Sequence, residues 1–266
     1  MKRSILIFTT TFLILGFSSC KKDENKINEK SNCSITSVTF DQEDNYELTY
    51  DGDLLIKFTE VDGDDEDKLY YNSDNLLTLR NYYTNDKLTN VDTFSYDASK
   101  RLTSVTWYSI NNSNKRVFEE KTSFEYNSSN QIISFKDSIN DDGYKQVDIH
   151  EISYQNNRRS KETFIRYTNN EIREKQVISY SYTNIANSLY DKSGQSYLVI
   201  NSHPLYIADF ENTDLLISQL DIKDFDETNT QTNEYSIKFD YTFENGNVKT
   251  VSMDKEEFIK FNYKCE

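Results

Sequence analysis

The chain has 266 residues and a formal net charge of −15, from 45 acidic and 30 basic residues. This excess of negative charge repels phosphates and anionic headgroups, so it argues against nucleic acid and against an anionic membrane surface as partners. Apolar residues make up only 36% of the chain, yet 16 Phe and 20 Tyr can bury large areas. The composition therefore argues against disorder and favours sheets with one face in water.

Residues 1–19 are expected to be a signal peptide. Lys2 and Arg3 form a positive start, and the apolar stretch from Ile5 to Phe17 is too short to span a bilayer. The segment Phe17-Ser18-Ser19-Cys20 resembles the bacterial lipobox, with Phe17 where leucine is usual. The resemblance implies that Cys20 is lipidated. An ordinary cleaved signal with an incidental cysteine is the alternative, but no Ala-x-Ala site is present.

Residues 20–32 are expected to be a lipid-anchored linker, because they are polar and lack a periodic apolar pattern. Residues 21–24 (KKDE) resemble the tag that directs some lipoproteins to the outer face of the outer membrane. We therefore expect an exported outer-membrane lipoprotein that faces the cell exterior and contacts the membrane through its anchor only. Removal of residues 1–19, which carry two positive charges, makes the formal charge −17.

An apolar residue, a spacer and a tyrosine recur eight times along the chain. Six of these triplets follow one another at intervals of 21 to 30 residues. Recurrence on this scale indicates a repeated supersecondary unit. The tyrosines of the triplets are Tyr50, Tyr71, Tyr96, Tyr126, Tyr154, Tyr180, Tyr241 and Tyr263.

One unit reads as two strands joined by a turn. Residues 93–96 alternate in polarity, residues 97–100 suit a turn, and residues 102–108 are rich in β-branched and aromatic residues. The second strand opens with Leu102 and Val105, three residues apart, a spacing that puts them on opposite faces of a regular strand. Either Leu102 still belongs to the turn or a β-bulge intervenes. Four other units show the same spacing: Leu55 and Phe58, Leu76 and Leu79, Ile132 and Phe135, Val248 and Val251.

Together the units predict an all-β fold, a long antiparallel up-and-down meander of roughly a dozen or more strands. Such a sheet must curl or close into a barrel to protect its edges. We predict one domain over residues 33–266, with a non-repeat insert at about 183–234. Within the insert, residues 202–210 (SHPLYIADF) predict a short helix, because the only proline lies at its first turn. Residues 212–220 suit a strand or a helix.

Cys33 and Cys265 lie near the two ends of the predicted domain. Outside the cytoplasm such a pair can form a disulfide, which would join the first and last strands of the sheet. Two unrelated free thiols are the alternative. With only His150 and His203 besides, no Cys/His cluster indicates a metal site.

Few side chains suggest chemistry. Asp62, Asp64, Asp65 and Asp67 form a weak calcium candidate, but their spacing does not match an EF-hand loop and an acidic hairpin turn explains them. Asp148 and His150 share one face of a strand, while Glu151 and Ser153 share the other, and no nucleophile elbow is present. No catalytic residue is nominated. The scattered glycines make no phosphate loop, and no cofactor is expected.

Two aromatic pairs are weak candidates for binding. Each pair puts one ring on each face of its strand, and rings exposed on a rigid sheet suit glycan or peptide ligands. Cross-strand packing is the alternative role. The four residues are Tyr82, Tyr83, Trp107 and Tyr108.

The lipobox and its tag, the Phe-x-Tyr-Asp/Asn strand pairs, the insert, and the final segments FDYTFENGNVKTVSM and KFNYKC resemble a family of bacterial lipoproteins of unknown function with a porin-like fold. A weaker similarity is to tyrosine–aspartate repeats of large secreted shell proteins. The resemblance implies architecture and no active site. Charges such as Lys57, Arg80, Glu125, Lys136 and Lys238 interrupt the strands and argue against a membrane-spanning pore.

Three hypotheses about function follow. The first is a non-catalytic, lipid-anchored binding or scaffold module for a glycan or protein. The second is a hydrolase with paired carboxylates in the concavity of the sheet. The third is a purely structural envelope protein, which a lumen filled by Phe and Tyr side chains would favour.

Overall fold

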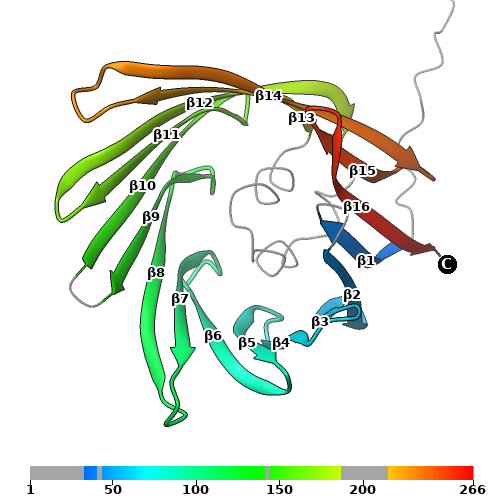
Figure 1. Ribbon diagram of the computed structural model, residues 1–266. Helices are drawn as coiled ribbons and strands as arrows, with labels where there is room; N and C mark the ends of the chain where they lie inside the picture. Colours follow the sequence, from blue (N-terminus) through cyan, green and yellow to red (C-terminus); the bar gives the residue numbers. More distant parts are fainter. Residues whose placement is uncertain (1–32, 41–43, 142–143, 187–214, 266) are drawn as a thin grey trace, which may run out of the picture. The chain divides into compact units, whose positions relative to one another are not determined.

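The computed structural model describes residues 33–40, 44–141, 144–186 and 215–265. These residues form sixteen antiparallel strands in one closed barrel (Figure 1). The predicted signal peptide, the linker and the helix at 202–210 lie outside the described residues. The strands are β1 Cys33–Phe40, β2 Asp44–Asp51, β3 Leu54–Glu60, β4 Asp65–Tyr71, β5 Leu77–Thr84, β6 Lys87–Tyr96, β7 Leu102–Ile110, β8 Arg116–Tyr126, β9 Ile132–Asp141, β10 Tyr144–Gln155, β11 Arg158–Thr168, β12 Glu171–Ala186, β13 Leu215–Phe225, β14 Gln231–Glu244, β15 Asn247–Met253 and β16 Glu256–Cys265.

Each strand pairs with its neighbours in sequence, and β16 pairs with β1 to close the sheet. The predicted antiparallel meander is confirmed, and it is closed rather than only curled. Closure leaves no edge strand exposed to other chains. The predicted insert contributes strands as well, since β13 takes up residues 215–220 of the apolar stretch whose structure the sequence left open.

The pairing of β1 with β16, the seam of the barrel, joins the first and last strands of the sheet. Cys33 lies opposite Cys265 in the register of this strand pair, and Cys33 is disulfide-bonded. The assignment of Cys265 as its partner stays a prediction, and the register favours it.

A β-bulge occurs at the start of the second strand of each repeat unit. In β6 and β7, Tyr96 lies opposite Leu102 and Ser95 lies opposite Ser104, so Thr103 is an extra residue. The bulge returns Leu102 and Val105 to the same face of the sheet. It therefore explains the spacing of three, and the alternative that Leu102 belongs to the turn is wrong. The same shift occurs next to Tyr50, Tyr71, Tyr126, Tyr154, Tyr182 and Phe243.

One unit departs from the predicted register. Tyr71 lies opposite Leu77 rather than Leu76. The pair that shares the inner face is therefore Leu77 and Arg80, one residue later than the sequence suggested. Arg80 consequently points to the inside of the barrel.

The repeated tyrosines join one unit to the next. The paired residues of β5 and β6 end at Leu79 and Thr93, and beyond them the Tyr96 hydroxyl donates to the carbonyl oxygen of Leu77 at 2.8 Å. The side chain thus takes over where the backbone ladder stops. Equivalent bonds of 2.6 to 2.9 Å run from Tyr71 to Leu55, Tyr126 to Leu102, Tyr154 to Ile132, Tyr182 to Arg159, Tyr241 to Ile217 and Tyr263 to Val248.

The member of this series in β12 is Tyr182, not Tyr180, whose triplet the sequence repeat selected. Tyr182 lies three residues beyond Ser179, the last residue that pairs with β11, as each of the other tyrosines does at its own junction. Tyr180 instead donates to the carboxylate of Glu162. The sequence motif at 178–180 therefore does not mark the structural equivalent.

The apolar side chains of the triplets lie in the interior of the barrel. Phe94 and Phe239 belong to the buried cluster, and Tyr96, Phe124 and Tyr241 pack against it from partly buried positions. The buried cluster draws on strands from both sides of the seam, so it fills part of the lumen rather than covering the outside. Its fully buried members include Val38, Leu77, Leu216, Ile217, Val248, Val251 and Ile259.

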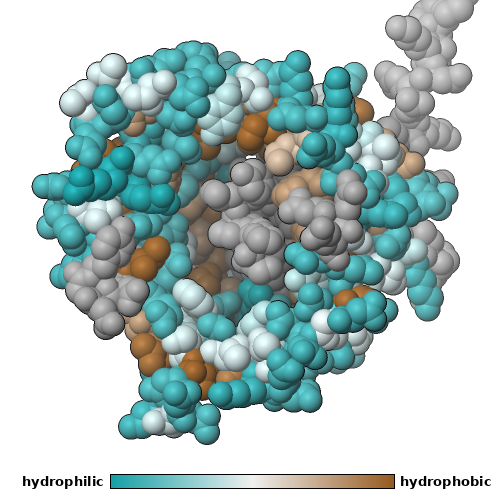
Figure 2. All heavy atoms as spheres, in the orientation of Figure 1, coloured by the Kyte–Doolittle hydropathy of each residue, from teal (hydrophilic) through white to brown (hydrophobic). Residues whose placement is uncertain are grey.

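The outer face of the barrel is mainly hydrophilic. Lys57 and Lys68 both pair with Glu66 on the outside of β3 and β4, and Lys223 pairs with Glu234 on β13 and β14. Figure 2 shows hydrophilic residues over most of the face in view and hydrophobic residues around the central hollow. A barrel in lipid needs the reverse arrangement, with an apolar band outside.

No helix among the described residues is long and apolar enough to cross a membrane.

Replacement of Tyr96 by Phe tests the role of the tyrosine hydroxyls. We expect Tyr96→Phe to lower the free energy of unfolding by about 1 to 2 kcal/mol, because the carbonyl of Leu77 loses its hydrogen bond in a partly buried site. Tyr108→Phe, on the outer face, should change it by less than about 0.5 kcal/mol. Denaturant unfolding measures both, and equal losses in the two variants would contradict this role.

The pH dependence provides a second readout of the same variant. Burial raises the pKa of Tyr96 from 10.0 to about 12, so the folded state keeps a proton that the unfolded state loses. Stability from this group is therefore present below pH 10 and is lost as the pH rises from 10 to 12. Tyr96→Phe should lose stability less steeply than the wild type in this window.

Candidate functional site

The polar side chains of the lumen follow a simple rule of position. Because side chains alternate along a strand, residues two and four positions before the apolar residue of a triplet face the lumen with it. Many of these positions carry acids. They include Asp44, Asp65, Asp67, Asp92, Glu120, Asp148 and Glu174, with His150 and Gln176.

One buried cluster lies on β4, β5 and β6. The Arg80 guanidinium donates from Nε and Nη2 to the two carboxylate oxygens of Asp67, each at 2.9 Å, and Nη1 lies 3.5 Å from Asp92 Oδ2. Asp67 is only 3% exposed and Arg80 only 8%. Burial raises the pKa of Asp92 to about 6 although the charge of Arg80 opposes this. A single guanidinium thus serves two carboxyl groups.

The four weak calcium candidates are divided between β4, which carries Asp65 and Asp67, and the exposed turn before it, which carries Asp62 and Asp64. Asp65 accepts hydrogen bonds from Tyr82 and, at 2.8 Å, from Thr84 Oγ1, while Asp67 is held by Arg80. Asp62 adopts a positive φ of 63° in the turn before β4. Within the described residues no group of three or more His, Cys, Asp or Glu side chains is arranged to hold a metal ion.

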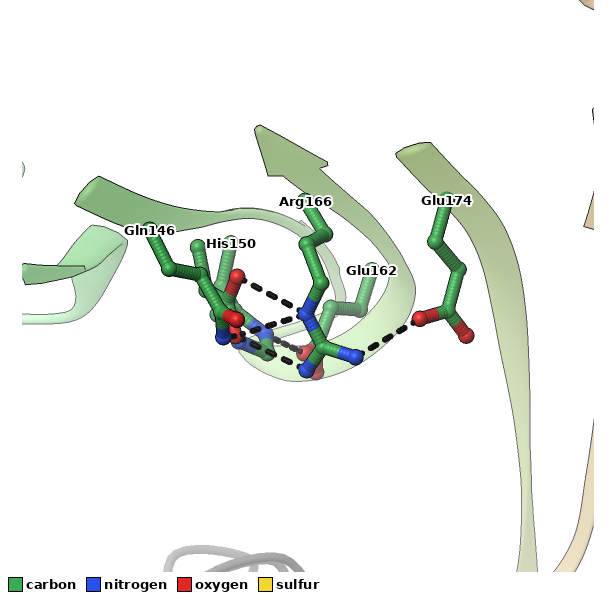
Figure 3. Close-up of polar contacts among 6 residues, drawn as sticks. Gln146, His150, Glu162, Arg166 and Glu174 are labelled. Atoms are coloured by element: carbon green, nitrogen blue, oxygen red, sulfur yellow. Dashed lines mark hydrogen bonds and ion pairs between the residues drawn. The ribbon is translucent and has the colours of Figure 1, made fainter. Parts of the chain in front are cut away.

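A second cluster lies on β10, β11 and β12 (Figure 3). Arg166 donates from Nη2 to Asp148 Oδ2 at 2.9 Å and from Nη1 to Glu174 Oε2 at 2.9 Å. Gln146 Nε2 also donates to Asp148 Oδ2 at 3.1 Å. Here too two carboxylates share one arginine.

His150 follows Asp148 by two residues on β10 and pairs with Glu162 rather than with Asp148. Its Nδ1 lies 2.6 Å from Glu162 Oε1, and the Tyr180 hydroxyl donates to Glu162 Oε2 at 2.6 Å. The imidazole stacks on Phe135, with ring centroids 4.0 Å apart. Burial would raise the pKa of Glu162, but the hydrogen bond to His150 and the charge of Arg159 lower it overall. Asp148 and His150 share the lumen face as predicted, and they do not form a catalytic triad with Ser153.

Between the two clusters, β7, β8 and β9 carry acids without an arginine. Trp107 lies directly opposite Asp92 on one side and Glu120 on the other, so its ring belongs to the lumen face. Burial, reinforced by the negative charges of Asp137, Asp148 and Asp92, raises the pKa of Glu120 to about 7. The described lumen-facing residues of these three strands include no Lys or Arg, because Lys121 and Lys136 lie on outer-face register pairs.

The four aromatic candidates divide between the two faces as predicted. Tyr82 and Trp107 face the lumen, and Trp107 is 41% exposed. On the outside, Tyr83 lies under the Lys68 ammonium group, and Tyr108 packs edge-on against Phe118. The outer pair therefore takes part in cross-strand packing, whereas Trp107 presents an accessible ring inside the barrel.

The sequence prediction missed most of this site. Glu120 and Arg166 were not singled out, although Glu120 stands four residues before Phe124 of a triplet. Arg80 was named only as a charge that argues against a membrane-spanning pore. The acids could have been found by taking the positions two and four residues before the apolar residue of each triplet. The two arginines lie on second strands, where the bulge changes which residues face inward.

Comparison with known proteins gives neighbours in structure only. No family model matches the chain, and no curated protein matches it. A porin-like protein from Bacteroides vulgatus has a TM-score of 0.47 and 13% identity, over 86% of this chain and 98% of that one. A porin-like protein from Bacteroides uniformis has a TM-score of 0.38 and 17% identity, over 87% and 96%. Both of these proteins are described as porin-like.

Removal of Arg80 tests the electrostatics of the first cluster. Arg80→Met should lower the free energy of unfolding at neutral pH by about 3 kcal/mol, because it leaves Asp67 buried without a counter-charge. The deficit should shrink as the pH falls from about 8 to about 5, since the carboxyl pKa values rise further and protonation removes the buried charge.

The control is Arg173→Met, which breaks exposed pairs with Glu171 and Glu227 and should cost less than about 1 kcal/mol. Unfolding curves at several pH values measure both variants. A deficit in Arg80→Met that is as small as in the control, or that is independent of pH, would refute the role of the arginine.

Proposed function

We propose that this protein is a non-catalytic, lipid-anchored envelope protein whose barrel acts as a binding module with its ligand site in the lumen. The observation that carries the proposal is the polarity of the two faces. The outer face carries ion pairs such as Lys57–Glu66, whereas the lumen holds the apolar cluster and the acids. A barrel with this distribution suits water on its outside.

The proposed lipid anchor and cellular location rest on the sequence. Cys20 follows an export signal, and the polar residues 21–32 are a tether of the right composition. Acyl chains on a single cysteine can hold a water-facing domain at a membrane, since each buried methylene contributes roughly 0.8 kcal/mol. We place the protein at the outer membrane, facing the cell exterior.

A purely structural role fits less well. It requires a lumen filled by Phe and Tyr side chains, and the buried cluster does fill the end nearest the triplets. Near Asp92 and Glu120, however, Trp107 keeps 41% of its surface exposed. An accessible aromatic ring beside carboxyl groups inside a concave wall is an arrangement that binding sites use.

A hydrolase is the second candidate. Burial raises the pKa of Glu120 to about 7, which would suit a general acid, and Asp137 and Asp92 lie near enough to contribute to the shift. This candidate differs from the binding module in one respect. It requires release of product from a bound glycoside, and a binding module releases none.

Exchange of the leader tests the proposal. In the variant, a signal that is cleaved without lipid attachment replaces residues 1–20. We expect the wild-type protein to incorporate labelled fatty acid and to follow the detergent phase, and the variant to be unlabelled and to enter the aqueous phase. A folded variant that stays in the membrane fraction would contradict the proposal, because a spanning barrel needs no anchor.

A further inference from the structure

We propose that the lumen wall formed by β6, β7, β8 and β9 binds an organic cation that carries an ammonium group. Trp107 supplies the aromatic face, and Asp92, Glu120 and Asp137 supply the negative charge. This inference rests on the proposed function and names the class of ligand for the same lumen.

The register gives the geometry of the site. Trp107 is paired across the sheet with Asp92 and with Glu120, so the ring has a carboxyl group on each side. Directly opposite residues in an antiparallel sheet have Cβ atoms about 5 Å apart. A cation over the indole would therefore lie within reach of both carboxylates. Indole is also the side chain whose face attracts cations most strongly.

The exposure of the ring distinguishes Trp107 from the other aromatic residues of the wall. Phe94 is 7% exposed and belongs to the packed cluster, whereas Trp107 is 41% exposed. Both side chains face the lumen, from neighbouring strands. The apolar packing thus ends before it reaches Trp107 and leaves this ring for a ligand.

The charges of this wall are not balanced by the protein. Arg80 makes a bidentate pair with Asp67 and reaches Asp92 only at 3.5 Å. Arg166 is engaged by Asp148 and Glu174. Among the described residues neither Glu120 nor Asp137 forms an ion pair, although Asp137 accepts a hydrogen bond from Thr122. No basic side chain stands on the described lumen face of β7 to β9. A bound cation would offset this excess, which also holds the pKa of Glu120 high.

Other ligand classes fit the wall less well. An anion would be repelled by the carboxylates. A metal ion would need several oxygen ligands in one place, and the described residues contain no such group. A neutral sugar could stack on Trp107, but it would leave the carboxylates without a counter-charge. An ammonium group uses both the ring and the acids.

Trp107 is the only tryptophan in the chain, so intrinsic fluorescence reports on this wall directly. The full-length protein is titrated in detergent with spermidine, glucosamine and N-acetylglucosamine. Glucosamine and N-acetylglucosamine are a matched pair, because acetylation removes the ammonium charge and keeps the sugar ring. We expect saturable changes in fluorescence with spermidine and glucosamine, and none with N-acetylglucosamine.

The variants locate the binding. Glu120→Gln should weaken the affinity for spermidine about tenfold, because one charged partner is lost. Glu125→Gln removes a carboxylate from the outer face of the same strand and should leave the affinity unchanged. Binding to the wild type should also weaken as the pH falls through about 7, because Glu120 then takes up a proton. Circular dichroism checks that each variant is folded.

Three results would overturn the assignment. They are no response to either cation, equal weakening by Glu120→Gln and Glu125→Gln, and saturable binding of N-acetylglucosamine in place of the cations. The last result would replace the ligand class and leave a lumenal binding module in place. The membrane partition of the leader variant tests the proposed function by a separate readout.

Discussion

The barrel depends on one repeated constraint, the bulge at the start of each second strand. The extra residue, Thr103 in the unit at Tyr96, turns two apolar residues to the same face. At the same rim the backbone hydrogen bonds between neighbouring units stop. There the tyrosine hydroxyl of the next unit donates to a backbone carbonyl oxygen that lies beyond the last paired residues of the two strands. Inward-facing apolar side chains and satisfied backbone groups thus come from the same device, and its recurrence around the sheet allows sixteen strands to close.

Closure with apolar side chains inside sets the chemistry of both faces. The outer face can carry Lys, Glu, Ser and Thr, so an acidic chain of low apolar content can still form a large β domain. Inside, packing is concentrated near the tyrosine rim, and the wall beyond it carries two ion clusters, of which the Arg80–Asp67 pair is buried and the one at Arg166 is partly exposed. Buried charges are costly to keep unless they are paired. The paired clusters at Arg80 and Arg166 meet this requirement, and the wall between them holds acids that a ligand can neutralise.

The sequence predicted the fold better than the site. Alternation within a unit such as residues 93–108 is a local signal, so strands and turns could be assigned without coordinates. The predicted count of a dozen or more strands holds, and the sixteen described strands include β13, which carries no triplet. Tyr180 and Tyr182 show a further limit. Both face inward, and only the end of the pairing between β11 and β12 determines which one joins the units.

The site was missed because it depends on register between strands. Arg80 interrupts an apolar strand and was interpreted as an outward charge that argues against a pore. The bulge at Tyr71 is of the same kind as the others, but it places Leu77 rather than Leu76 opposite this tyrosine, so Arg80 lies inside, beside Asp67. Lys57, Glu125 and Lys136 were interpreted in the same way and do lie on the outer face. No pattern within one strand distinguishes these cases, because the register with the neighbouring strand decides whether a charged side chain lies on the inner or the outer face.

The central claim is that this barrel keeps its apolar face inside and its hydrophilic face in water while the protein is held at a membrane. Nitroxide labels on the outer face of three separated strands test it most directly, introduced singly at Ser104, Ser179 and Ser252 of the full-length protein in membranes. The account predicts that a water-soluble relaxation agent reaches all three labels freely. Protection from that agent, with access for oxygen dissolved in lipid, would contradict it.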